Sequence, residues 1–320
     1  MRIGVFTVLF QDMPFEKALD RAVAAGVTAV EIGAGGYPGR HHCPVDDLLE
    51  SEAKRSAYRR ALDSRGLILS ALSCHYEPLS PDPSLADESD AIFRKAVRLA
   101  ALLEVSVVNV MSGLPAGCAG DRSPSWVTCP WPPHNLAMID YQWNTVAIPY
   151  WQSAAKFAGE HGVKIAVEMH PGFLVYNVET LLKLRNAVGP VLGCNFDPSH
   201  LFWNGVEVPS AIRALGDAIY HVHGKDCSVD PLNLAVNGCN DWKPYDQIPK
   251  RAWTFRSIGY GHDEKTWKDI MSALRLAGYD YVISIEHEDA LMSRNEGLAK
   301  GVAMLKNVLM AEAPGKMYWA

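Results

Sequence analysis

Carboxylates and imidazoles interrupt four apolar runs in the second half of the sequence. The runs end in Glu168-Met169-His170, Asn195-Phe196-Asp197, His221-Val222-His223 and Ser284-Ile285-Glu286. Alternate residues of a strand share one face, so Glu168 should lie on the same face as His170. A buried charge without a partner is costly, so each of these acids needs a cation or hydrogen-bond donors close by.

A divalent metal site is the chemistry that this set of residues favours. Three carboxylates beside one imidazole repel one another unless a cation lies between them. We therefore expect four residues to bind one ion: Glu168, Asp197, His223 and Glu286. Oxygen-rich ligation with one imidazole suits Mn²⁺, which we favour, and also Mg²⁺, Co²⁺ or Zn²⁺. The alternative is a salt-bridge network in which Lys225 and Arg256 neutralise the acids.

Two neighbouring side chains are candidates for proton transfer or substrate binding. An imidazole titrates near neutral pH, so His170 is a candidate acid or base. Its alternative role is that of a hydrogen-bonded support. Lys225 either donates to a substrate oxygen or forms a salt bridge with Asp226.

These residues lie at the ends of a repeated unit. In each unit an amphipathic stretch ends in glycine and a short β-branched run follows at once, as after Gly26, Gly66 and Gly162. Glycine readily adopts the left-handed conformation that ends a helix. Near-continuous apolar runs are typical of strands in parallel sheets. The pattern predicts eight strands, at 2–9, 27–33, 67–73, 105–112, 163–170, 191–197, 218–224 and 281–287.

Eight strands that alternate with helices predict an α/β fold, a (β/α)8 TIM barrel, with its active site at the carboxyl ends of the strands. A doubly wound open sheet would need a glycine-rich phosphate loop after the first strand, and residues 8–15 contain no glycine. We expect one barrel domain over 1–320, with insertions near 113–147 and 227–262. Both insertions follow strands, so both should border the active-site face.

Tryptophan is frequent in and beside these insertions. Aromatic faces stack on the C–H faces of sugars or on planar aglycones, but they also pack long loops. Trp203, which follows the sixth predicted strand, is the tryptophan that we single out. Together with His200, Lys225 and Arg256 it forms our set of candidate substrate contacts.

Composition disfavours several classes of function. Lys and Arg number 30 against 36 Asp and Glu, a net charge of −6, which disfavours a nucleic-acid binder. The chain has no run of 18 apolar residues that would cross a membrane. The N-terminus lacks a signal-peptide pattern, and the seven cysteines form no CxxC pair. We therefore expect reduced thiols and a cytoplasmic protein.

The motifs VEMHP, FDPSH, HVHGKD and SIEHED, taken together, resemble those of the xylose-isomerase-like TIM barrels, the sugar phosphate isomerases/epimerases, over essentially the whole chain. The resemblance implies one divalent metal on Glu168, Asp197, His223 and Glu286, and places His200 of the DxxH motif near metal-bound water or substrate. Similar branches are the inosose dehydratases, the ketose 3-epimerases and the catalytic subunits of C-glycoside deglycosidases. Ketose 3-epimerases carry an arginine six residues after the metal-binding histidine, where this chain has Val229.

Proton abstraction next to a carbonyl is the expected reaction. A bound metal polarises a sugar carbonyl and stabilises an enediolate, while Glu168, Glu286 or His170 removes the carbon-bound proton. Return of the proton at another position gives our first interpretation, a keto-sugar isomerase or epimerase. Expulsion of a β-substituent gives the alternative, a lyase on 3-keto-glycosides or an inosose-type dehydratase.

Expected partners follow from the same resemblance. We expect a small sugar or glycoside substrate, no nucleic acid and no membrane. Aromatic insertions on one face predict a homodimer or a complex with a small β-rich subunit. A DNA-repair endonuclease of this barrel type would need three zinc ions and a basic groove. A sugar-binding barrel without activity would normally lose part of the metal-binding set.

Overall fold

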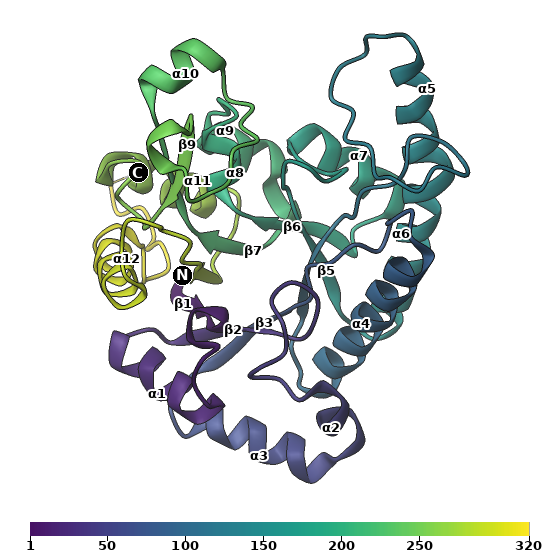
Figure 1. Ribbon diagram of the computed structural model, residues 1–320. Coiled ribbons are helices and arrows are strands. Elements are labelled where there is room, and N and C mark those ends of the chain that lie inside the picture. The colour runs from purple at the N-terminus through teal and green to yellow at the C-terminus, as the bar shows by residue number, and fades with distance from the viewer. Residues whose placement is uncertain (320) are drawn as a thin grey trace.

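Eight short parallel strands close into a barrel in the computed structural model, which describes residues 1–319 (Figure 1). The order around the barrel is β1, β10, β7, β6, β5, β4, β3, β2. The barrel strands are β1 (Arg2–Phe6), β2 (Ala29–Gly33), β3 (Ile68–Ser73), β4 (Val107–Met111), β5 (Lys164–Glu168), β6 (Leu192–Phe196), β7 (Ile219–Gly224) and β10 (Val282–Ile285). Each lies within a predicted strand, and the predicted (β/α)8 barrel is confirmed.

Helices surround the barrel and connect its strands (Figure 1). They are α1 (Phe15–Ala25), α2 (Val45–Glu50), α3 (Glu52–Asp63), α4 (Pro83–Leu102), α5 (His134–Asp140), α6 (Ile148–Glu160), α7 (Val178–Val188), α8 (Pro198–Phe202), α9 (Val208–Leu215), α10 (Pro231–Asn237), α11 (Glu264–Leu276) and α12 (Arg294–Val308). A π-helical turn over Tyr141–Ala147 joins α5 to α6. Among the described residues, no helix is both long and apolar enough to cross a membrane.

The helix-to-strand turns follow the glycine pattern of the sequence. Gly26 ends α1 with φ 85° and ψ 26°, a left-handed conformation in which its amide bonds to the carbonyls of Ala22 and Val23. The chain then enters β2, whose five residues are all buried. Burial on both faces explains why the sequence of β2 is apolar at every position except Glu31. The barrel interior covers one face of the strand and the helices cover the other.

Two long segments rise from the carboxyl ends of barrel strands. The segment after β4 carries α5, and the segment after β7 carries α10 between β8 (Asp226–Val229) and β9 (Trp253–Arg256). Strands β8 and β9 pair antiparallel. In Figure 1, α10 and α5 stand well apart at the top of the view. These segments correspond to the predicted insertions near 113–147 and 227–262.

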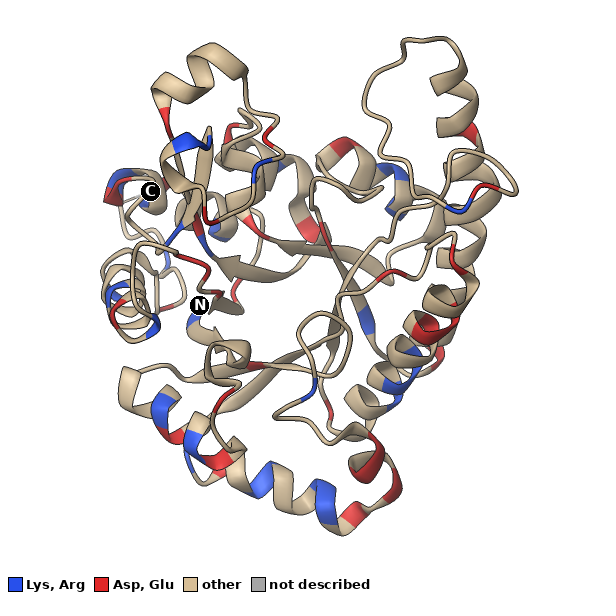
Figure 2. Cartoon of the chain, in the orientation of Figure 1, with Lys and Arg blue, Asp and Glu red and all other residues tan. Residues whose placement is uncertain are grey.

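Charges of both signs are spread over the outer helices. Figure 2 shows basic and acidic residues on each of α1, α3 and α4. None of these three helices therefore carries charges of one sign alone. The barrel interior differs, because three acids of its strands or strand ends are buried: Glu31, Glu168 and Asp197.

Candidate metal centre and adjoining pocket

The four residues predicted to bind a metal converge at the carboxyl ends of their strands. Glu168 ends β5, Asp197 follows β6, His223 lies in β7 and Glu286 follows β10. Each offers one ligand atom, and these atoms lie within 4.8 Å of one another. We call these four residues the acid–histidine cluster. Neighbouring strands β5, β6, β7 and β10 bring them together because they are consecutive around the barrel.

His223 lies at the centre of the cluster. Its Nδ1 is 3.4 Å from Glu168 Oε2, 3.3 Å from Glu286 Oε2 and 4.0 Å from Asp197 Oδ2. Burial by itself would lower the pKa of this histidine, but the negative charges of Glu31, Glu286 and Glu168 hold it well above its usual range. The imidazole thus faces a strongly negative surrounding.

Asp197 provides the observation that fits a cation. Its Oδ2 is buried and forms no hydrogen bond of good geometry with any described residue, although Lys225 Nζ is 3.0 Å away and His200 Nε2 is 3.3 Å away. Burial raises the pKa of Asp197 to about 6; Lys225 opposes the rise, and the charges of Glu168 and Glu286 add to it. A buried carboxylate oxygen that lacks a hydrogen bond among other acids has the character of a metal ligand.

Lys225 is the cation nearest to the cluster. Its Nζ lies 2.6 Å from Glu286 Oε2 and 3.0 Å from Glu288 Oε2, and it sits 4.6 Å from the ring centroid of Phe255. The alternative prediction that Lys225 forms a salt bridge with Asp226 is therefore wrong, because Lys225 pairs with acids at the strand ends. Lys225 and a protonated His223 would carry two positive charges against the cluster's three carboxylates, Glu31 and Glu288, so the donor set still fits a divalent ion.

Asp226 points away from the cluster and fixes the fold around it. Its Oδ2 accepts hydrogen bonds from the amides of Gly259, Gly261 and His262 at 3.0 to 3.1 Å. The indole of Trp267 donates to the same oxygen at 3.2 Å. Asp226 thereby anchors the segment that follows β9 to helix α11.

Two histidines besides His223 contact Glu168, and His170 packs against one of them. His200 Nε2 lies 3.2 Å from Glu168 Oε1, and His75 Nε2 lies 3.1 Å from its Oε2. Burial lowers the pKa of His200 to about 3, so its imidazole is neutral. The ring of His170 lies 4.1 Å from that of His200, and its Nδ1 is 2.7 Å from the carbonyl oxygen of Pro171. His75 was not selected from the sequence, where it is one of several histidines next to predicted strands.

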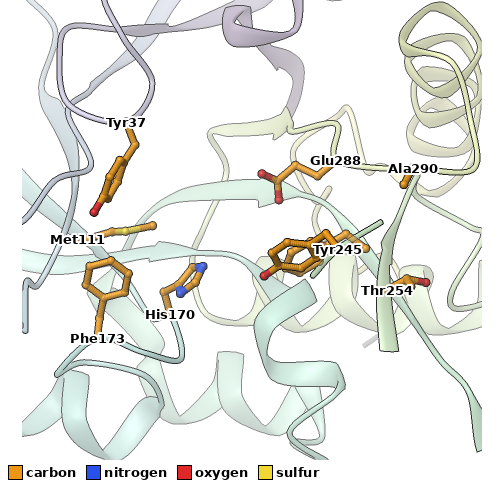
Figure 3. A pocket seen from close by; sticks show the side chains of 9 residues that line it. Tyr37, Met111, His170, Phe173, Tyr245, Thr254, Glu288 and Ala290 are labelled. Atoms are coloured by element: carbon orange, nitrogen blue, oxygen red, sulfur yellow. The ribbon is translucent and has the colours of Figure 1, made fainter. Parts of the chain in front are cut away.

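A cavity of about 560 Å³ adjoins the cluster. Figure 3 shows Tyr37, Met111, Phe173 and His170 on one side of it, with Glu288 and Tyr245 opposite. His170 joins the cavity to the cluster through His200, and Glu288 does so through Lys225. The lining residues are Tyr37, Met111, His170, Phe173, Tyr245, Thr254, Phe255, Glu288 and Ala290. The cavity therefore has mainly apolar and aromatic walls beside a polar floor.

Two of the predicted substrate contacts lie elsewhere. Trp203 stacks on Trp253 with ring centroids 4.4 Å apart and planes 6° from parallel, inside a small buried cluster. Arg256 pairs with Asp289 at 3.1 Å. Neither residue lines the cavity, because both are engaged in packing or pairing the segment after β7. His200 and Lys225 lie at the cluster instead.

Glu31 is a component that the sequence analysis did not select. It lies in β2, is fully buried, and its Oε1 and Oε2 are 3.0 and 3.1 Å from His223 Nε2. Burial alone would raise the pKa of Glu31, but the charges of His223 and His221 hold it far below its usual range. A lone carboxylate inside the apolar run 27–33 was the available signal.

Comparisons with known proteins give the same architecture. A family model described as "Xylose isomerase-like TIM barrel" matches residues 19–308. The uncharacterized protein YfiH of Bacillus subtilis (strain 168) is 41% identical over 312 residues, which cover 97% of this chain and 99% of YfiH.

Solved structures of the same fold include enzymes of two kinds. A probable 3-DHS dehydratase, AsbF, from Bacillus anthracis superposes with a TM-score of 0.67 at 16% identity, covering 96% of this chain and 99% of that one. A D-psicose 3-epimerase, solved in the presence of D-fructose, gives a TM-score of 0.63 at 14% identity, covering 97% and 99%. On the family match and the barrel topology, the chain belongs to the xylose isomerase-like TIM barrel family.

Proposed function

We propose that the protein is a divalent-metal-dependent isomerase or epimerase of a keto-sugar. The observation that carries the proposal is the convergence of four ligand atoms within 4.8 Å beside a cavity of about 560 Å³. Epimerases and dehydratases occur among the structural neighbours, and both kinds of reaction can begin by removing a proton next to a carbonyl. We propose a cytoplasmic location for the enzyme.

One metal ion would be held by Glu168, Asp197, His223 and Glu286. Mn²⁺ is our first choice, because three carboxylates with one imidazole form a hard donor set; Mg²⁺, Co²⁺ and Zn²⁺ are the other candidates. When bound, such an ion supplies a Lewis acid that polarises the substrate carbonyl.

The protein's own groups would then move the proton. Glu168 and Glu286 come from β5 and the end of β10, with β6 and β7 between them, so they approach the centre from different directions. One carboxylate removes the proton from the carbon next to the carbonyl, and the other returns it to the opposite face. Lys225, next to Glu286, would donate a hydrogen bond to a substrate oxygen.

A lyase reaction is the second candidate, and the cavity is the observation that favours it. Tyr37, Phe173, Tyr245 and Phe255 form walls that suit a planar aglycone, and His170 adds an imidazole on the same side. In that reaction, loss of the proton is followed by cleavage of the bond to a β-substituent, which leaves with the electron pair. The substrates would be 3-keto-glycosides, including C-glycosides, or inososes.

Association is part of the proposal. Trp131 and Trp242, in the segments that carry α5 and α10, are 72% and 90% exposed. Such aromatic side chains are enriched where protein surfaces meet. We propose a homodimer or a complex with a small β-rich subunit, and light scattering of the purified protein tests it. A fully active particle of 35.2 kDa would contradict it.

The reaction is tested by NMR in D₂O with Mn²⁺-loaded protein. The substrates are D-fructose, a 3-keto-glucoside and a 3-keto aryl C-glycoside. An epimerase incorporates deuterium next to the carbonyl and forms a new stereoisomer, whereas a lyase releases the aglycone. If the loaded protein produced neither exchange nor cleavage with any of them, the proposed function would be refuted.

The metal centre is tested by metal analysis of Asp197→Asn. Asp197 also accepts a hydrogen bond from the Ser199 amide at 2.8 Å and so caps α8. Asparagine keeps this cap but lacks the charge. We expect about one equivalent of divalent metal in the wild type, much less in Asp197→Asn, and a wild-type amount in Asp87→Ala, a control at an exposed position of α4. Equal metal content in all three proteins would contradict the assignment.

A further inference from the structure

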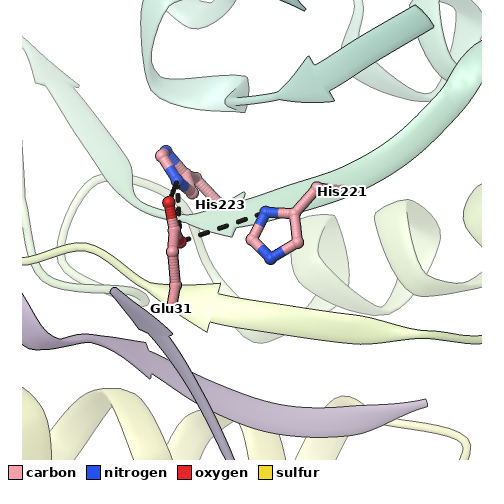
Figure 4. A group of neighbouring side chains, drawn as sticks. All are labelled: Glu31, His221 and His223. Carbon is pink, nitrogen blue, oxygen red and sulfur yellow. Dashed lines mark hydrogen bonds and ion pairs between the residues drawn. The ribbon is translucent and has the colours of Figure 1, made fainter. Parts of the chain in front are cut away.

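The two ring nitrogens of His223 face different partners. Nδ1 points to the cluster carboxylates, with Glu286 Oε2 at 3.3 Å and Glu168 Oε2 at 3.4 Å. Nε2 points in another direction, to both oxygens of Glu31 at 3.0 and 3.1 Å. Asn195 Nδ2 lies farther from Nε2, at 3.2 Å, and also donates to Glu168 Oε2 at 2.9 Å. Figure 4 shows Glu31 reaching from β2 to this histidine. Among the described residues, the imidazole of His223 is thus the direct contact between Glu31 and the proposed metal centre.

Glu31 has its own set of hydrogen-bond donors. Its Oε1 accepts from Ser73 Oγ at 2.5 Å and from Asn109 Nδ2 at 3.0 Å, and its Oε2 accepts from Ser284 Oγ at 2.7 Å. These donors come from β3, β4 and β10, so three strands fix the carboxylate. Ser284 and His223 are also directly paired in the register of β10 and β7.

A second metal between Glu31, His221 and His223 is the competing interpretation, because their ligand atoms also lie close together. The surroundings of His221 disfavour it. Its Nδ1 lies 3.0 Å from Asn195 Oδ1 but 4.0 Å from Glu31 Oε2, and its Nε2 is 3.2 Å from Ser70 Oγ. Neutral partners therefore occupy both nitrogens, and the Glu31 oxygens already have donors.

We infer that Glu31 is a positioning residue that selects the metal-binding nitrogen of His223. A neutral imidazole carries its proton on one nitrogen and keeps a lone pair on the other. Glu31 holds the proton on Nε2 as a hydrogen bond, so the lone pair of Nδ1 is directed at the cluster. Such outer carboxylates fix the ring orientation and increase the basicity of a ligating histidine. The inference rests on the proposed metal centre and adds a residue to it.

The same buried layer supports a second ligand. Asn195 Nδ2 donates to Glu168 Oε2 at 2.9 Å, while Asn195 Oδ1 faces His221. Since Glu168 and Asn195 are paired in the register of β5 and β6, the amide holds the carboxylate from the adjacent strand. Glu31 and Asn195 therefore have corresponding roles: Glu31 forms a hydrogen bond with His223, and Asn195 forms one with Glu168.

Mn²⁺ titration tests the role of Glu31, with free Mn²⁺ measured by electron paramagnetic resonance. Glu31→Gln keeps the size of the side chain and removes its charge. We expect it to weaken Mn²⁺ binding about 10- to 100-fold, the range found when outer hydrogen-bond partners of ligands are replaced. Ser70→Ala is the matched control, because Ser70 is equally buried and contacts His221 and the Val30 carbonyl but neither Glu31 nor His223.

A second variant and a second measurement separate positioning from a general effect on folding. Ser284→Ala removes one donor to Glu31 and keeps the charge, so it should weaken Mn²⁺ binding by a smaller factor. Selective ¹⁵N-histidine NMR of the Zn²⁺-loaded protein should show His223 protonated at Nε2 in the wild type. This signature should change in Glu31→Gln. The metal-free control Ser70→Ala should keep the unfolding temperature of the metal-free wild type.

Three results would overturn the inference. Mn²⁺ affinities of Glu31→Gln and Ser284→Ala equal to that of Ser70→Ala would leave Glu31 without a positioning role. Two bound Mn²⁺ per wild-type chain, with one lost in Glu31→Gln, would make Glu31 a metal ligand. Absence of Mn²⁺ binding by the wild type would refute the metal centre itself, and with it the proposed function, which distinguishes the two failures.

Discussion

Replacing His170 by Asn should distinguish a catalytic imidazole from a supporting one. His170 lines the cavity, and its Nδ1 lies 2.7 Å from the Pro171 carbonyl oxygen. The amide of asparagine can reach the same carbonyl, so the variant keeps this local hydrogen bond. What it loses is Nε2, the nitrogen that no described residue engages and that is free to accept a proton.

The expected loss of turnover follows from that geometry. If Nε2 accepts a proton from the substrate, its loss should reduce kcat about 10²–10⁴-fold, the usual contribution of a general base. If the ring only supports His200, whose centroid is 4.1 Å away, the effect reaches the cluster through one further residue. About tenfold is then expected. We predict the larger loss, because His170 faces the cavity while His200 contacts Glu168.

The assay is kcat of Mn²⁺-loaded wild type and variant at equal measured metal content. His161→Asn is the matched control, since His161 Nδ1 also bonds a local carbonyl oxygen, that of Phe157 at 2.8 Å, but lies at the end of α6 outside the cavity. The control should keep wild-type turnover. A loss below about tenfold in His170→Asn would refute the catalytic role and favour epimerisation by the two carboxylates alone.

Two further predictions concern stability. Asp226→Ala should lower the free energy of unfolding by about 3 kcal/mol or more, because it leaves the half-buried amides of Gly259, Gly261 and His262 and the buried Trp267 indole without their acceptor; a change below about 1 kcal/mol in urea unfolding would contradict this. Burial lowers the pKa of His42, which lies 3.0 Å from the Met13 carbonyl oxygen, below 6.5. The unfolded chain then binds the proton more readily than the folded chain, so stability should fall as pH drops below 6.5. The fall should be less steep in His42→Gln. Equal slopes of unfolding temperature against pH in the wild type and in His42→Gln would contradict this prediction.

The barrel and the acid–histidine cluster could be predicted because both follow from local patterns in the sequence. Glycine followed by a β-branched run marks each entry into a buried strand, and strand ends in a parallel barrel all lie on one face. Glu168, Asp197, His223 and Glu286 could therefore be placed together without knowing any distance. Their order along the chain matches their order around the barrel, which made the inference simple.

Glu31 was missed because its partners are distant in the sequence. It lies 192 residues before His223, and the contact depends on the closure of β1 against β10 and β2. One of the two roles considered for Lys225, the salt bridge to Asp226, is wrong for a related reason. Adjacent residues of an extended segment point to opposite sides, so Lys225 faces the cluster while Asp226 faces helix α11. Sequence proximity suggested a salt bridge that this alternation prevents.

The hairpin after β7 has an apolar residue at the position where the epimerase pattern has an arginine. Val229, at the position where an arginine is expected in the epimerase pattern, lies in β8 directly opposite Trp253 and packs against the small cluster that contains Trp203. An arginine there would have to leave this apolar packing to reach a substrate. Lys225, at the start of the same segment, instead lies 2.6 Å from Glu286. The cation at the proposed centre is therefore at the strand end, where Lys225 Nζ lies 4.6 Å from the ring of Phe255, which also lines the cavity. Under the proposed function, this aromatic lining would favour substrates with an apolar group beyond the sugar.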